Sequence, residues 1–218
     1  QSDVVIRFQG GANAGHTIIC DYGKFALHQL PSGVFYPHTT NIIGNGVALD
    51  VKKFLAELKH LADGGVPAPH IIVDQRTQLL MSYHVLLDSY EEERLAGAAF
   101  GSTKSGIAPF YSDKYQKKTV MAGELLHPQH LKEHLADLLE WKNLTLQKVY
   151  GAKGYTLDEL LAWVDKYCEA VKPYITNTTA FLRDAQKAGK SILFEAQLGA
   201  LRALDYGIYP YTTSSNSV

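Results

Sequence analysis

Short apolar runs rich in β-branched residues alternate along this chain with longer segments whose apolar residues follow helical spacing. The runs that predict buried strands are residues 4–8, 41–43, 70–74 and 191–194. Helices are expected after the capping residue Asp50 and over residues 83–95, 128–142, 156–170 and 175–188. Interleaved strands and helices of these lengths predict an α/β fold, in which helices flank a mostly parallel central sheet.

Further features are expected around this sheet. Residues 17–20 and 25–30 predict a small hairpin, and residues 100–118 are expected to form a loop because glycines and Pro109 interrupt any regular pattern. The second strand is expected to stop at Gly44–Gly46. Residues 1–218 are therefore expected to be part of one α/β domain with a helical insertion at about 120–188. A strand follows the first residues at once and the last residues are polar, so we expect an incomplete domain, an interior piece of a longer protein.

The charge balance argues against two classes of partner. The chain of 218 residues carries a formal net charge of -1, whereas nucleic-acid and membrane-surface proteins usually present a basic face. No apolar run approaches the length of a membrane span, and no signal peptide is visible. The two cysteines, Cys20 and Cys168, are expected to be free thiols in a reducing compartment, which favours a cytoplasmic protein.

Three polar loops follow predicted strands, at residues 9–16, 101–114 and 195–217. In parallel sheets, ligands bind beyond the carboxyl ends of the strands. We therefore expect the three loops to converge on one site.

The first loop partly matches the phosphate-binding pattern G-x-x-x-x-G-K-[ST]. Gly10, Gly15 and Thr17 fit it, but His16 replaces the lysine and a strand is expected where the pattern requires a helix. A flexible backbone next to an imidazole suits close approach to an anion. The alternative is an ordinary glycine-rich turn with a hydrogen-bonded histidine.

The other two loops also carry ligand-binding chemistry. Gly101–Gly106 supplies hydroxyls, backbone N–H groups and the cation of Lys104, as phosphate binding requires. The third loop begins with Glu195 and Gln197 and ends in the hydroxyl-rich stretch Thr212–Asn216. A solvated surface loop and a polar linker are the alternatives for the two. A zinc site at the histidines of residues 127–134 is rejected, because leucines at helical spacing predict that the histidines face solvent.

Several separated stretches occur in a characteristic order. They are Arg7–Thr17 (RFQGGANAGHT), Leu27–Gly33, Ile42–Val47, Gly101–Thr103, Gly106–Pro109, Tyr111, Asp113–Lys114, Leu193–Glu195 and Asp205–Asn216. In these stretches the chain resembles adenylosuccinate synthetase, a ligase of purine biosynthesis. The resemblance runs along nearly all of the chain but covers only about the first half of a family member. Ordered motifs of this kind are more specific than any one of them.

The resemblance implies a two-step reaction, a cofactor and an assembly. The γ-phosphoryl group of GTP moves to the 6-oxygen of IMP, and the amine of L-aspartate then displaces phosphate to give adenylosuccinate. Mg²⁺ is the implied cofactor and a homodimer the implied assembly.

The matching positions imply roles for individual residues. His16 is the implied catalytic residue, which stabilises the charge that develops during phosphoryl transfer. The implied substrate contacts are Asn13, Thr103, Lys117, Gln197 and Thr213. Gly15, His16 and Thr17 are expected at the GTP, and the carbonyl of Gly15 is expected to hold Mg²⁺.

The chain also departs from the family pattern. The family's catalytic aspartate would precede residue 1, and its guanine-reading and aspartate-binding segments would follow Val218. Lys117 stands where an arginine reaches the neighbouring subunit's IMP. The family's Glu-Gly-Ala-Gln-Gly appears as Glu195–Gly199 (EAQLG), with the glutamine shifted by one position.

Three functions therefore stay open. The first is a ligase, of which this piece alone would be inactive. The second is a non-catalytic homologue that binds purine nucleotides or only dimerises, and the altered glutamine loop favours it. The third is an unrelated kinase, against which the failed phosphate-loop context counts.

Overall fold

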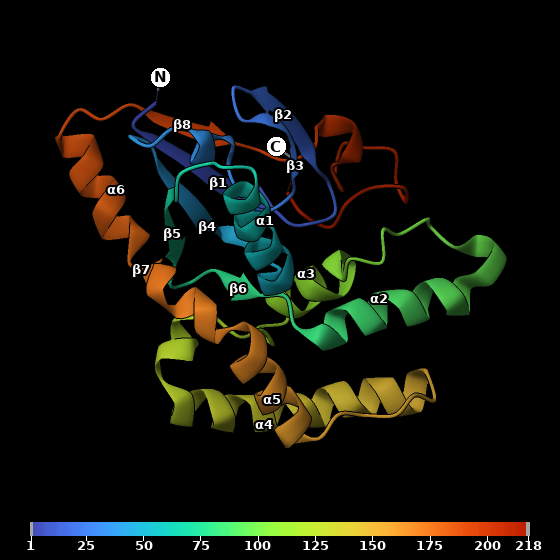
Figure 1. Cartoon of the computed structure of the whole chain (residues 1–218). Coiled ribbons are helices and arrows are strands. Elements are labelled where there is room, and N and C mark those ends of the chain that lie inside the picture. The colour runs from blue at the N-terminus through green and yellow to red at the C-terminus, as the bar shows by residue number, and fades with distance from the viewer. Residues whose placement is uncertain (1, 217–218) are drawn as a thin grey trace.

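A computed structural model describes residues 2–216 and shows a parallel sheet with helices on both faces (Figure 1). The strands are β1 Val4–Gly10, β4 Thr40–Leu49, β5 His70–Asp74, β6 Gln78–Leu79, β7 Ile175–Thr176 and β8 Ile192–Glu195. Their order is β7-β5-β4-β1-β8, with β6 also paired to β4, and every pair is parallel. The antiparallel hairpin consists of β2 His16–Cys20 and β3 Gly23–Leu27. The predicted α/β fold class is confirmed.

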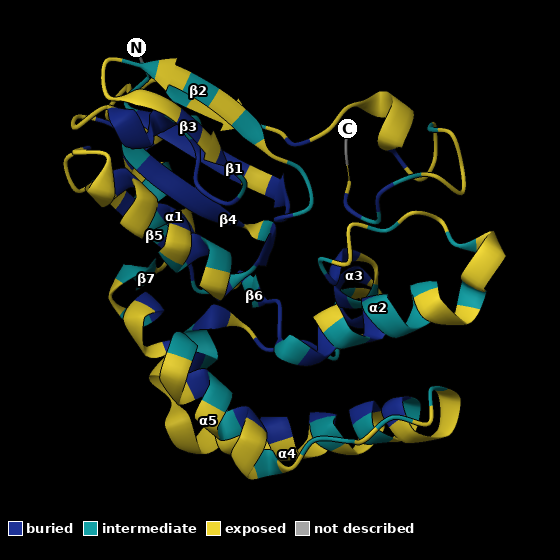
Figure 2. Cartoon of the chain, turned by 45° about the vertical axis from the view of Figure 1, so that its right-hand side comes forward, coloured by how far each residue is buried: buried dark blue, intermediate teal, exposed yellow. Residues whose placement is uncertain are grey.

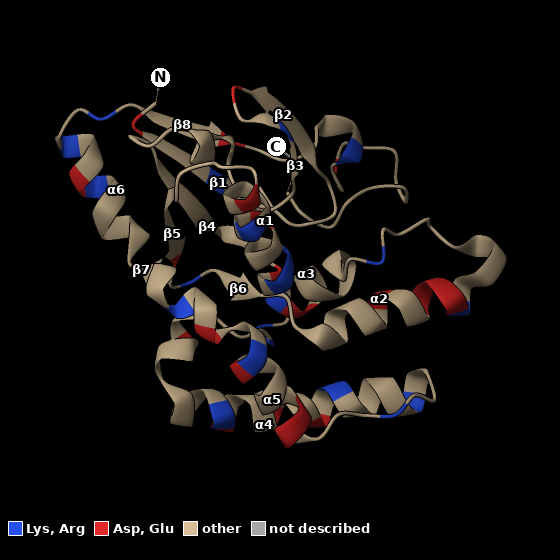
Figure 3. Ribbon diagram, viewed as in Figure 1, with Lys and Arg blue, Asp and Glu red and all other residues tan. Residues whose placement is uncertain are grey.

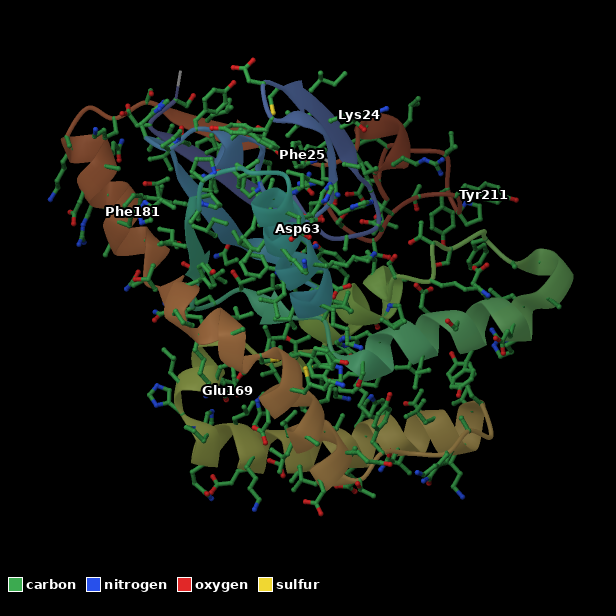
Figure 4. The ribbon with its side chains drawn as sticks, in the orientation of Figure 1. Lys24, Phe25, Asp63, Glu169, Phe181 and Tyr211 are labelled. Atoms are coloured by element: carbon green, nitrogen blue, oxygen red, sulfur yellow. The ribbon has the colours of Figure 1, made fainter. Side chains whose placement is uncertain are left out.

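Helices cover the two faces of the sheet. The long helices are α1 Val51–Asp63, α2 Ser82–Leu95, α3 Ile107–Tyr115, α4 Pro128–Leu144, α5 Leu157–Tyr167 and α6 Thr178–Lys187. Short 3-10 or π turns lie at Ser32–Phe35, Ala96–Ala98, Ala122–Leu126, Thr145–Val149, Glu169–Tyr174 and Ala200–Arg202. Helix α1 packs with Ile43 and Val73 in the large core, whereas Phe181 of α6 packs on the opposite face beside Ile6 and Ile42 (Figure 4). Strands β1 and β4 are consequently buried along most of their length (Figure 2).

The amphipathic pattern of α1 explains its position. The side chain of Asp50 accepts hydrogen bonds from the backbone N–H groups of Lys52 and Lys53, as an N-cap residue does. Phe54 and Leu61 lie on one helical face and are buried against the sheet. None of the helices within residues 2–216 combines the length and apolar character needed to cross a membrane.

Strand β4, which was expected to stop at Gly44–Gly46, is longer than predicted. It continues through Gly44–Gly46 to Leu49. Its register with β1 shifts between Arg7 and Gln9, where two residues of β4, Gly44 and Asn45, lie opposite Phe8 alone. A Cβ atom at position 46 would lie 2.1 Å from the carbonyl oxygen of Phe8. Glycine therefore permits the close pairing here and does not end the strand.

The predicted loop at 100–118 contains the helix α3, so this expectation was wrong over residues 107–115. Pro109 lies in the first turn of the helix, where a missing N–H group costs nothing. Phe110 and Tyr111 are buried, and the Tyr111 hydroxyl lies within hydrogen-bond distance of the carbonyls of Gly10 and Gly46 at 3.0 and 2.8 Å. Packing against the ends of β1 and β4 thus stabilises a helix that the composition of this segment does not predict.

The expected helix at 175–188 begins later than predicted. Residues 175–176 pair with β5 as β7, and Asn177 then caps α6 by accepting from the N–H of Ala180. Helix α4 confirms the helix predicted over residues 128–142, and its leucines pack in the large core together with those of α5.

Glu57 of α1 ties the segment after β3 to the sheet. Its carboxylate is buried and accepts hydrogen bonds from the backbone N–H groups of His28, Gln29 and Leu30 at 2.7 to 3.1 Å. Gln29 and Leu30 are completely buried, so these donors depend on Glu57 for a partner.

The substitution Glu57→Ala is predicted to lower the free energy of unfolding by about 3 kcal/mol, because buried backbone donors would lose their acceptor. Urea denaturation measures this. Asp63→Ala on the same helix is the control, since Asp63 only pairs with Lys59 at the surface and should change stability by less than about 0.5 kcal/mol. Equal losses in the two variants would contradict the role of Glu57.

Candidate active site

The first loop leaves β1 at Gly10 and returns to the hairpin at His16. Gly10 has a φ of +92°, a conformation that favours glycine. The side chain of Gln197 reaches the loop from the segment after β8: its Oε1 accepts from the N–H of Gly11 at 2.7 Å, and its Nε2 donates to the carbonyl of Ala14 at 2.6 Å. The loop is therefore an ordered turn.

His16 lies beside an ion pair between a buried arginine and a partly buried glutamate. Arg7 of β1 and Glu195 of β8 are partners in the parallel register, and Arg7 Nη1 lies 3.7 Å from Glu195 Oε1. The same nitrogen lies 3.3 Å from His16 Nδ1. A guanidinium can only donate, so Nδ1 accepts and the proton of the neutral imidazole resides on Nε2. His16 Nε2 lies 3.8 Å from Glu195 Oε1.

The charge state of His16 follows from these surroundings. Burial, and then the neighbouring guanidinium of Arg7, lowers the pKa of His16 below its ordinary value of 6.5. The ring is therefore neutral at pH 7 and presents an N–H donor at Nε2. Glu195 is oriented by Ser32, whose backbone N–H and hydroxyl donate to Glu195 Oε2 at 2.8 and 2.5 Å.

The second loop is held by acidic residues of α2 (red in Figure 3). Asp88 accepts from the N–H of Gly106 and the hydroxyl of Ser102, both at 2.7 Å. Glu92 accepts from the N–H groups of Phe100 and Gly101 at 3.1 Å. Several donors that the sequence offered to a phosphate are thus used to shape the loop. Gly106 precedes α3 without a side-chain cap, so the first N–H groups of α3 stay available.

A cleft of about 790 Å³ joins all three loops. Asn13 of the first, Thr103 of the second and Thr213 of the third line it, and Asn13 Nδ2 donates to Thr213 Oγ1 at 3.3 Å. Tyr211 lies on the C-terminal segment, across the cleft from α2 (Figure 4). Residues that are far apart in the sequence therefore share one cavity.

The remaining predicted residues do not line this cleft. Gln197 is buried against the first loop, and His16 faces Arg7 and Glu195. Gly15 and Thr17 are exposed beyond the cleft, where the ring of His28 lies against Gly15. Lys117 is exposed after α3 with a φ of +63°.

A buried cluster at the cleft escaped the sequence analysis. His84 Nε2 lies 2.8 Å from Asp113 Oδ2, and the ammonium of Lys142 donates to the same oxygen. His84 Nδ1 accepts from the N–H of Met81 at 2.9 Å, so Nε2 carries the proton. Asp113 and Lys142 line the cleft. The three residues come from α2, α3 and α4, and no spacing in the sequence could have revealed their contact.

The charges in this cluster are set by mutual compensation. Burial raises the pKa of Asp113, but the hydrogen bonds from His84 and Lys142 outweigh it and hold the carboxylate ionised. Burial lowers the pKa of both Lys142 and His84, and the nearby carboxylate opposes this.

Within residues 2–216, no group of three or more histidine, cysteine, aspartate or glutamate side chains could hold a metal ion by itself. Mg²⁺ commonly keeps several waters and binds through few protein ligands plus substrate phosphates. A single backbone carbonyl, such as that of the exposed Gly15, fits this manner of binding.

Comparison with known proteins identifies relatives of the whole chain. The family described as adenylosuccinate synthetase matches residues 1–218. The adenylosuccinate synthetases of Carboxydothermus hydrogenoformans and Halothermothrix orenii are each 41% identical, over 100% and 99% of this chain and 51% and 50% of their own length. The structure of fully ligated adenylosuccinate synthetase from Plasmodium falciparum matches with a TM-score of 0.85 and 30% identity, over 100% of this chain and 50% of that one. The chain thus spans about half the length of the relatives it matches.

The buried cluster predicts how stability depends on pH. Because the pKa of folded His84 lies below its unfolded value of about 6.5, protonation favours the unfolded chain, and the free energy of unfolding should fall as the pH drops below 6.5. One such proton contributes at most about 1.4 kcal/mol per pH unit. Denaturation at pH 7.5 and 5.5 measures the fall, and His84→Gln should reduce it. A His84 imidazole NMR signal that titrates near pH 6.5 in the folded protein would contradict this assignment.

Proposed function

Because the chain belongs to the adenylosuccinate synthetase family, we propose that the full-length protein joins IMP and L-aspartate to form adenylosuccinate, with GTP as the phosphoryl donor. The observation that carries the proposal is the single cleft shared by Asn13, Thr103 and Thr213, which come from three loops far apart in the sequence. Amide and hydroxyl groups of this kind suit a sugar phosphate and a purine base.

The reaction requires activation of a poor leaving group. The 6-oxygen of IMP attacks the γ-phosphorus of GTP, and the bond from that phosphorus to the bridging oxygen breaks to release GDP. The amine of aspartate then attacks C6, inorganic phosphate leaves with the former 6-oxygen, and the nitrogen loses its proton. The family's catalytic aspartate, which would precede residue 1, is assigned the removal of the N1 proton of IMP.

His16 is proposed to stabilise the transferring phosphoryl group. Its neutral ring carries the proton on Nε2, as the contact with Arg7 requires, so it can donate a hydrogen bond to a phosphate oxygen at neutral pH. Gly15 and Thr17 flank it and are proposed to contact GTP. The carbonyl of Gly15 is proposed to hold Mg²⁺, which neutralises charge on the phosphates when bound.

The cleft is proposed to bind IMP. Thr103 and Thr213 would contact its phosphate region and Asn13 its other polar groups. The first residues of α3, Ile107 and Ala108, line the same cleft, and a helix N-terminus favours an anion. Gln197 is proposed to support IMP binding indirectly, by holding the first loop, because both polar atoms of its side-chain amide are already bonded there.

Lys117 is proposed to act across a homodimer interface. It is exposed and does not line the cleft of its own chain, as expected of a residue that reaches the partner's IMP. A cytoplasmic location is also proposed, because the chain belongs to a family of purine-biosynthesis enzymes.

The proposal is tested with the full-length protein, IMP, GTP, Mg²⁺ and L-aspartate, by following adenylosuccinate formation in the ultraviolet. Omission of any one component, or removal of Mg²⁺ by a chelator, should abolish turnover. Nucleotide binding without turnover would instead establish a non-catalytic homologue, the alternative raised by the altered glutamine loop.

His16→Ala in the full-length protein is predicted to reduce kcat by about 10²–10⁴-fold, because the transition state loses a positioned donor. His38→Ala is the matched control. His38 is exposed, and within residues 2–216 the only aromatic ring that it contacts is that of Tyr36. A His16→Ala enzyme with near-normal kcat would remove this residue from the mechanism.

A further inference from the structure

Two adjacent residues after β8 have opposite surroundings. Gln197 is 5% exposed and does not line the cleft, whereas Leu198 is 37% exposed and does. Leu198 has a φ of +66°, a left-handed conformation that a branched side chain rarely adopts. Such a backbone persists only where its surroundings hold it, and it is typical of functional sites.

Every polar group of the Gln197 side chain is used by the first loop. Its Oε1 accepts from Gly11 and its Nε2 donates to Ala14, so the amide spans the turn between them. The backbone carbonyl of Gln197 in turn accepts from Gln9 Nε2 at 2.9 Å. A Cβ atom at Gly10 would lie 2.2 Å from Gln197 Oε1, so the side chain lies directly on the loop backbone.

We infer that Gln197 is a positioning residue that clamps the loop carrying Asn13 and His16, while Leu198 takes over the adjoining part of the cleft wall and offers the bound nucleotide an apolar contact. The inference rests on the proposed function for its nucleotide. The clamp itself rests only on the contacts of Gln197. A ligand surface next to Leu198 should therefore be a base or sugar face without hydrogen-bonding groups.

The clamp is tested without any nucleotide, by amide hydrogen exchange of residues 10–15 in the full-length protein. Gln197→Glu replaces the Nε2 donor with a carboxylate oxygen that repels the carbonyl of Ala14, so the side chain should leave the loop and the Gly11 amide should lose its acceptor. Exchange of the Gly11 amide should rise by about tenfold, the equivalent of one lost buried hydrogen bond. Leu198→Gln is the matched control and should leave this exchange unchanged. Unchanged exchange in Gln197→Glu would overturn the clamp, whether or not the protein turns over IMP.

The division of roles is tested by steady-state kinetics with IMP. Gln197→Glu should lower kcat more than it raises KM, because a loosened loop misplaces His16. Leu198→Gln should raise KM about 3- to 10-fold with a smaller change in kcat, and the volume-conserving Leu198→Met should restore most of the affinity. A lower KM for IMP in Leu198→Gln would contradict the apolar contact. A raised KM with unchanged kcat and protected loop amides in Gln197→Glu would show that Gln197 binds the substrate by hydrogen bonding instead of positioning the loop. Absence of turnover in the unaltered protein would refute the proposed function and leave the exchange result standing.

Discussion

The parallel pairing of β1 with β4 on one side and β8 on the other determines where the polar residues of this protein meet. In the register with β8, Arg7 stands next to Glu195, and the buried guanidinium then lies against the ring of His16. A buried charge needs a partner, so this pair is stable only with both strands in place. The same pairing directs the first and third loops to one edge of the sheet, where the segment after β8 can reach the loop after β1.

Carboxylates that accept backbone N–H groups hold the surrounding loops in shape. Glu57 does so after β3, and Asp88 does so for the second loop. Backbone donors left unpaired away from water are costly, so each carboxylate restricts its loop to one conformation. Because these acceptors project from α1 and α2, which pack on the body of the protein, the loops inherit the rigidity of the helices. These carboxylates consequently fix the loops around the cleft.

The sequence predicted the placement of some site residues but not of others. Asn13, Thr103 and Thr213 were expected to converge, and they line one cleft. The placement of His16 beside Arg7 and Glu195 could not be foreseen, because it depends on strand register over nearly 190 residues of chain. The hydrogen bonds of Gln197 to the first loop were likewise hidden, since a glutamine looks the same in sequence whether it faces a ligand or a neighbouring turn.

The amino-acid sequence alone determined the class of fold and the position of α1 with its cap at Asp50, because these depend on local periodicity and spacing. The order of its motifs carried the resemblance to the adenylosuccinate synthetase family, which the comparisons then showed. Only the tertiary structure decided that β4 passes through Gly44–Gly46 and that α3 forms around Pro109. It alone assembled the cluster of His84, Asp113 and Lys142. The physical reason is that these features depend on contacts between distant segments: a close backbone approach, a buried aromatic face and charges that compensate one another away from water.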